Sequence, residues 1–89
     1  MQKDMGLVNL YLEQIRALAV RAQNGEDVSE SVAAAVAKAK EHFSNVVGHS
    51  SGELVSAYVS QLKLQSHIAH ESQPILKKTL LEAARLAAG

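Results

Sequence analysis

The amino-acid sequence predicts an all-α fold, and both its composition and the spacing of its apolar residues point to it. Alanine is abundant, whereas the 89 residues include only five glycines and one proline, a balance that favours closely packed helices. Apolar residues recur at intervals of three and four along most of the chain, which is the period of a helix face. Because a chain of this length forms one domain or less, we expect a single all-helical domain over residues 1–89.

The first predicted helix covers residues 3–24. Its apolar face contains Leu7, Val8, Tyr11, Ile15, Leu18, Ala19 and Ala22. Asn24 and Gly25 follow directly, and glycine ends helices because it adopts the left-handed conformation without steric cost. We therefore expect the helix to stop at this pair of residues.

The second predicted helix covers residues 27–47. Asp27, followed three residues later by Glu30, is a variant of the capping box that begins helices. The apolar stripe of this helix contains Val28, Val32, Ala35, Ala39, Phe43 and Val46. Because the break between the first two helices is so short, residues 1–48 are compatible with two helices or with one bent rod, and we treat them as an N-terminal helical arm.

A third helix is predicted over residues 51–88, within a C-terminal segment 52–89 that follows a polar turn at residues 48–52. Ser50 with Glu53 at the fourth position forms a capping box, which predicts a helix start there. One apolar stripe contains Leu54, Tyr58, Leu62, Ala69, Leu76, Leu80, Ala83 and Ala87. A second, adjacent stripe contains Ala57, Leu64, Ile68, Ile75 and Leu86. The opposite, polar side contains Lys63, His67, His70, Lys77, Lys78 and Arg85.

Pro74 lies in the middle of this third helix. Proline lacks the backbone N–H and clashes with the carbonyl four residues earlier, so it should interrupt a helix. The apolar stripes nevertheless keep the same phase on both sides of Pro74, which favours one continuous helix kinked at this residue. The alternative is a fresh short helix capped by Ser72.

The length of such a helix predicts an extended helical hairpin. A helix of residues 52–88 would be about 55 Å long, whereas a compact globule of this size has a radius of gyration of only about 12 Å. A hairpin has two layers, and two adjacent apolar stripes need more neighbours than that, so we expect copies of the chain to cover one another. The alternative is a compact four-helix bundle, broken at Gly25, Gly48 and Pro74, whose stripes face two helices of the same chain.

If copies of the chain associate, the apolar stripes of the C-terminal segment are the surfaces that do so. The predicted self-association residues are Leu54, Tyr58, Leu62, Leu64, Ile68, Ile75, Leu76, Leu80 and Leu86.

Composition argues against several classes of function. Nine basic and nine acidic side chains cancel, which gives no footprint for nucleic acid. Three aromatic residues disfavour a large aromatic-lined pocket, and no apolar run is long enough to span a membrane. Polar residues interrupt the N-terminal apolar run, so no cleavable signal peptide is predicted. We therefore expect a protein that is cytoplasmic or is exported without such a signal.

No catalytic pattern or cofactor is predicted. Ser50 and Ser51 beside His49 are better explained by helix capping than by nucleophilic catalysis, since no acid is placed to orient the histidine. His67, His70 and Glu71 share a helix face if the helix is continuous, and such residues can bind zinc. A solvated polar face is the simpler interpretation of these three, and no metal is predicted.

The C-terminal segment ELVSAYVSQLKLQSHIAHESQPILKKTLLEAARLAA resembles the C-terminal helix of type III secretion needle subunits and, less closely, of inner rod subunits. The matching features are the L-x-x-Y/Q-x-x-L type start from Leu54, a polar middle with Glu71 and Ser72, and the following Ile75, Leu76 and Lys77. The resemblance covers residues 52–89, and residues 27–43 fit loosely as the N-terminal helix of that family.

This resemblance implies a self-assembling structural subunit that polymerises into a hollow helical filament for protein export. It further implies secretion or cell-surface location without a cleavable signal, and contacts with secretion apparatus proteins or a chaperone. A polar face would line the lumen, and the residues implied there are Lys63, His67, His70, Lys77 and Lys78.

Other functions fit the same helices. A small helical bundle could act as an adaptor, regulator or inhibitor that docks one face on a protein partner. A wide apolar arc could also coat a hydrophobic surface, as phasin-like proteins do. The remaining alternative is a metal-dependent protein that uses His67, His70 and Glu71.

Overall fold

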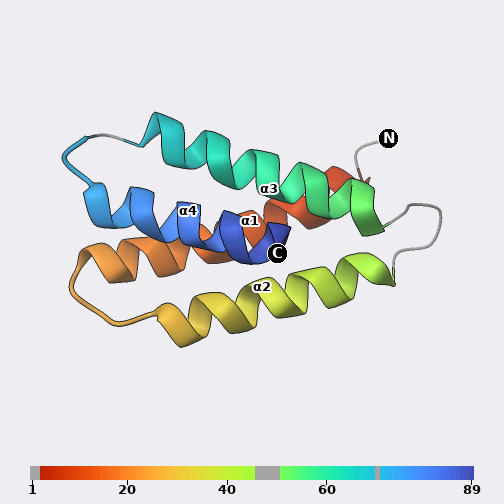
Figure 1. Ribbon diagram of the computed structural model, residues 1–89, viewed down its shortest axis with the longest axis horizontal. Coiled ribbons are helices and arrows are strands. Elements are labelled where there is room, and N and C mark those ends of the chain that lie inside the picture. The colour runs from red at the N-terminus through yellow and green to blue at the C-terminus, as the bar shows by residue number, and fades with distance from the viewer. Residues whose placement is uncertain (1–2, 46–50, 70) are drawn as a thin grey trace.

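The computed structural model describes residues 3–45, 51–69 and 71–89, and these residues form four helices (Figure 1). Helix α1 is Lys3–Gln23, α2 is Ser29–Ser44, α3 is Ser51–Ile68 and α4 is Pro74–Ala88. Successive helices run in opposite directions, and α4 contacts each of the other three. The radius of gyration is 12.6 Å and the molecule measures 40 × 24 × 20 Å. The all-α prediction is confirmed, and the arrangement is the compact four-helix bundle rather than the extended hairpin.

The prediction of one helix through Pro74 is wrong. Helix α3 ends at Ile68, and Pro74 is the first residue of α4. At that position proline needs no N–H partner and its fixed φ angle suits the first turn, so Pro74 begins a helix instead of kinking one. The helix-capping position is occupied by Gln73, not Ser72, and the Gln73 carbonyl accepts a hydrogen bond from the Lys77 N–H at 3.1 Å.

The matching phase of the apolar stripes across Pro74 has a different cause from the one predicted. Leu54, Tyr58 and Leu62 of α3 and Leu80 and Ala83 of α4 all lie in one core. Two antiparallel helices that pack on the same core each carry a stripe facing it. Agreement of phase therefore follows from a shared core and does not require a continuous helix.

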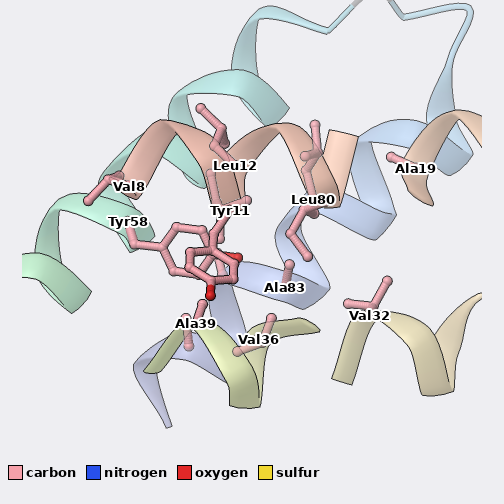
Figure 2. Packing of buried hydrophobic residues seen from close by; sticks show 14 of the residues in the cluster. Val8, Tyr11, Leu12, Ala19, Val32, Val36, Ala39, Tyr58, Leu80 and Ala83 are labelled. Atoms are coloured by element: carbon pink, nitrogen blue, oxygen red, sulfur yellow. The ribbon is translucent and has the colours of Figure 1, made fainter. Parts of the chain in front are cut away.

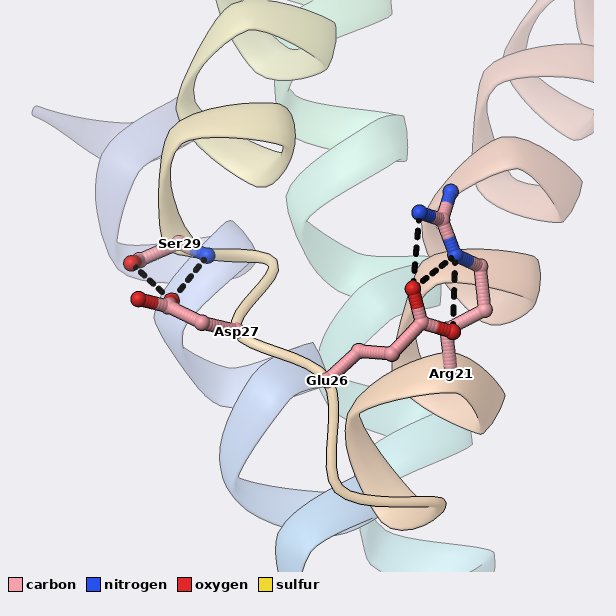
Figure 3. A network of polar contacts seen from close by, with 4 residues as sticks. All are labelled: Arg21, Glu26, Asp27 and Ser29. Atoms are coloured by element: carbon pink, nitrogen blue, oxygen red, sulfur yellow. Dashed lines mark hydrogen bonds and ion pairs between the residues drawn. The ribbon is translucent and has the colours of Figure 1, made fainter.

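The turn between α1 and α2 is held by two polar contacts (Figure 3). The Arg21 guanidinium donates to the Glu26 carboxylate at 3.0 Å and 3.2 Å, and an Asp27 oxygen accepts from the Ser29 N–H and hydroxyl at 3.2 Å and 2.6 Å. Gly25, which lies between Arg21 and Glu26 in the sequence, has a φ of +100°. This is the left-handed conformation expected where a helix stops. The prediction of a capping box from Asp27 and Glu30 is wrong: α2 begins at Ser29, its capping position is Val28, which makes no side-chain capping hydrogen bond, and Asp27 accepts from Ser29 instead.

The core contains a layer of aromatic rings at one level of the bundle. The rings of Tyr11 and Phe43 lie edge to face with centroids 5.7 Å apart, and those of Phe43 and Tyr58 do so at 5.4 Å. Figure 2 shows Tyr11 and Tyr58 converging from α1 and α3 above Ala39 of α2. Edge-to-face pairs of this kind contribute about 0.5–1.5 kcal/mol beyond the burial of their surface. This layer therefore joins the first three helices.

Candidate interaction surface

The two predicted stripes of the C-terminal segment have different environments. Within the first stripe, Leu54, Tyr58, Leu62 and Leu80 are buried inside the chain's own core. Within the second stripe, Leu64 is 49% exposed, Ile68 62% and Ile75 45%. Leu76 and Leu86 are partly buried against the core. The residues predicted to self-associate are therefore divided between the interior of one chain and its surface.

A groove lies between α1 and α3 with α4 as its floor, and its volume is about 470 Å³. Its apolar residues are Val20, Ile68, Ala69, Leu76 and Leu80. Val20 is half exposed, and among the described residues Ile68 is the most exposed large apolar side chain. Both walls of the groove thus present apolar surface to solvent.

The polar groups of the groove are Arg16, Gln65 and Gln73. Arg16 pairs with Glu13 on the same helix at 3.0 Å, and both side chains are at least half exposed. Such an exposed pair contributes little to stability. The groove therefore contains one exposed guanidinium and two amides, which can donate hydrogen bonds to a bound chain.

The outward side of α3 continues the apolar surface of the groove. Ala57, Gln61, Leu64 and Ile68 follow one another at intervals of four, three and four residues, the spacing of a coiled-coil seam. Ala57 and Gln61 are partly buried, and Leu64 and Ile68 are exposed. We call these four residues the outer α3 seam.

The predicted polar face is divided between two helices. Lys63 and His67 are exposed on α3, Lys78 is exposed on α4 and Lys77 is partly buried there. His70 lies outside the described residues. The break between α3 and α4 means that these side chains do not form one continuous face of a single helix.

A second, smaller hollow of about 340 Å³ lies between the start of α2 and α4. It contains the carboxylates of Glu26, Asp27 and Glu82. Each carboxylate has a partner that lowers its pKa: the Arg21 guanidinium for Glu26, the Ser29 hydroxyl and N–H for Asp27, and the Arg85 guanidinium for Glu82. These acids are therefore engaged in local contacts.

The residues considered for metal binding and catalysis are not assembled into a site. His67 lies on α3, but Glu71 lies in the turn after that helix, so the helical spacing between them is lost. Within residues 3–45, 51–69 and 71–89, no three His, Cys, Asp or Glu side chains are grouped to hold a metal ion. His49 and Ser50, like His70, fall outside the described residues.

No protein-family model, curated protein or solved structure matches the chain. The site must therefore be interpreted from its own chemistry. Of the helices in the described part of the chain, none has the length and apolar character needed to cross a lipid bilayer.

The contribution of α1 to the groove was not predicted from the sequence. Val20 and Arg16 lie outside the predicted apolar face of the first helix, and only the packing of α1 beside α3 brings them next to Ile68. Val20 follows Leu18 and Ala19 of the core face, and a single apolar residue off that face is an ordinary surface residue. The signal in the sequence was Ile68 of the second stripe, which lies in one wall of the groove.

Proposed function

We propose that this protein is a helical-bundle interaction module that binds a protein helix along the groove between α1 and α3. The observation that carries the proposal is the position of Ile68, 62% exposed at the edge of a groove whose floor is Leu76 and Leu80. A groove between two helices with an apolar floor accepts the apolar side of an amphipathic helix. Removing apolar surface from water stabilises such a complex by about 25 cal/mol per Å².

Photo-crosslinking in the native cell tests this proposal. A photoreactive phenylalanine analogue replaces Ile68 in one variant and Val20 in a second, and Lys38, an exposed residue of α2, in the control. We expect discrete crosslinked products from the two groove positions and none of these from the Lys38 position. Absence of products at Ile68 and Val20, or the same products at all three positions, would contradict the proposal.

A second candidate is the self-assembling filament subunit implied by the resemblance to secretion needle proteins. A filament subunit needs two different contact surfaces, because head-to-tail association must continue from copy to copy. The exposed Leu10 on α1 and Leu81 on α4 supply apolar surface outside the groove residues, which favours this candidate. Its argument from the length of the C-terminal helix no longer holds, because that helix ends at Ile68.

Negative-stain microscopy and light scattering of the purified protein separate the two candidates. The filament candidate, which also entails export without a cleavable signal, predicts fibres whose amount rises with protein concentration. A monodisperse species at high concentration would remove the filament candidate and leave the interaction module.

A further inference from the structure

We propose that a second copy of this chain binds the outer α3 seam, with the two α3 helices antiparallel across a twofold axis. The inference rests on the proposed function, because the outer α3 seam shares Ile68 with the groove between α1 and α3, and it names the partner that covers this side of α3. In this arrangement Ala57 of one copy lies opposite Ile68 of the other, and Gln61 lies opposite Leu64.

The first support for a second copy is that the seam is complementary to itself in this direction. Antiparallel pairing places the small Ala57 against the large Ile68 at both ends, so the distance between the helices stays even. Parallel pairing would set Ala57 against Ala57 at one end and Ile68 against Ile68 at the other, which would leave a gap at the first. Close packing without voids is what stabilises an apolar interface.

The second support is the distribution of charge along α3. The first turn carries Glu53 and the last turn carries His67, and the four residues of the seam carry no charge. Antiparallel pairing sets the helix dipoles in opposite directions, which is favourable. Parallel pairing would bring like ends together.

Gln61 has a defined place in this arrangement. It is the polar residue of an otherwise apolar seam, and the two copies of Gln61 flank the twofold axis. A polar side chain at one seam position costs stability, so Gln61 opposite Leu64 weakens the pairing.

The available area sets the strength of the dimer. A stable interface buries about 800 Å² on each partner, whereas the seam spans about 17 Å of a single helix. The seam alone is too small, and the exposed Val20 beside it on α1 must contribute. We therefore expect a weak, reversible dimer rather than an obligate one, with a dissociation constant on the order of 10 μM or weaker.

Sedimentation velocity at protein concentrations from about 10 μM to 1 mM tests for the dimer, because this range begins at the expected dissociation constant and extends to weaker binding. We expect Leu64→Asp to weaken dimerisation at least tenfold. Leu81→Asp is the matched control, since Leu81 is 50% exposed and lies on α4, and it should leave the monomer–dimer equilibrium unchanged. Circular dichroism shows whether each variant keeps its helices. If both variants remain folded and dimerise equally weakly, the inference is overturned.

Disulfide trapping tests the direction of pairing independently. The chain has no cysteine, so Ala57→Cys and Ile68→Cys each introduce a single thiol. Under mild oxidation, a mixture of the two variants should form the mixed disulfide faster than either variant alone forms its own. Faster Ala57→Cys homodimers would overturn the antiparallel arrangement.

The two proposals fail in different ways. A protein that is monomeric at every concentration yet crosslinks to a different protein at Ile68 would overturn the dimer and retain the interaction module. A monomer that gives no crosslinks at Ile68 or Val20 would overturn both.

Discussion

At the scale of single residues, the two tyrosine hydroxyl groups of the aromatic layer differ in their partners. The Tyr11 hydroxyl and Nδ1 of His42 are 2.8 Å apart and share a hydrogen bond. The Tyr58 hydroxyl is buried without a hydrogen-bond partner among the described residues. A buried polar group without a partner is destabilising, whereas a satisfied one is mildly stabilising. The two residues are therefore expected to respond to removal of the hydroxyl in opposite directions.

Replacing Tyr58 by phenylalanine should raise the free energy of unfolding by about 1 kcal/mol, because the ring stays and an unsatisfied hydroxyl is removed. The matched change, Tyr11→Phe, should lower it by about 0.5–1.5 kcal/mol, because a hydrogen bond is lost. Urea unfolding followed by circular dichroism measures both. A decrease of similar size in the two variants would show that the Tyr58 hydroxyl has a stabilising role.

Burial of Tyr58 also makes a prediction for alkaline solution. Burial raises the pKa of Tyr58 in the folded protein above the ordinary value of about 10 for tyrosine. Above pH 10 the unfolded chain therefore releases this proton while the folded chain retains it, so stability falls as pH rises. Urea midpoints between about pH 8 and 11 should decline less in Tyr58→Phe than in the parent protein. Identical declines would contradict this assignment.

At the scale of helices, the break between α3 and α4 shows what periodicity can and cannot predict. The inward faces were predictable, because Leu54, Tyr58 and Leu62 and then Leu80 and Ala83 occupy the core as their spacing indicates. Whether the helix continues through Pro74 was not predictable, because two antiparallel helices that share a core give the same apolar pattern as one long helix. Pro74 would distinguish these two arrangements only if it were known whether it lies in the first turn of a new helix, where proline is favoured, or in the interior of a long one.

Pro74→Ala tests whether the proline itself breaks the helix. The Leu76 N–H donates to the Gln23 side-chain oxygen at 3.2 Å, a contact to α1 that a continuous helix would remove. We expect the variant to keep two helices. Its free energy of unfolding should fall by less than about 1 kcal/mol, chiefly because the unfolded chain gains conformational freedom. NMR chemical shifts of residues 69–73 measure the outcome. Helical shifts throughout that range would show that proline alone had separated the helices.

At the scale of the whole molecule, exposure separates residues that the sequence placed in one set. Leu80 is 1% exposed, whereas Ile68 is 62% exposed, although both were predicted to mediate self-association. The sequence could not distinguish them, because both fall on apolar stripes of the same predicted helix. Only the packing of α4 against all three other helices reveals which stripe is interior.

A pair of aspartate substitutions uses this difference. Leu80→Asp places an unpaired charge in the core. Such a substitution lowers the free energy of unfolding by more than about 4 kcal/mol, so the bundle should unfold. Ile68→Asp should keep the helical content and the thermal transition within a few degrees. Circular dichroism melting curves measure both. Unfolding by Ile68→Asp would place that residue in the core.

The central position of α4 also affects the order of events during synthesis. Chains are made from the N-terminus, and segments can fold as they emerge. Helices α1, α2 and α3 each contact α4, which is translated after all of them. Until it emerges, the inner sides of three completed helices lack the partner that covers them. The nascent chain therefore exposes the most apolar surface after α3 has emerged and before α4 has, the interval in which a chaperone has most surface to bind.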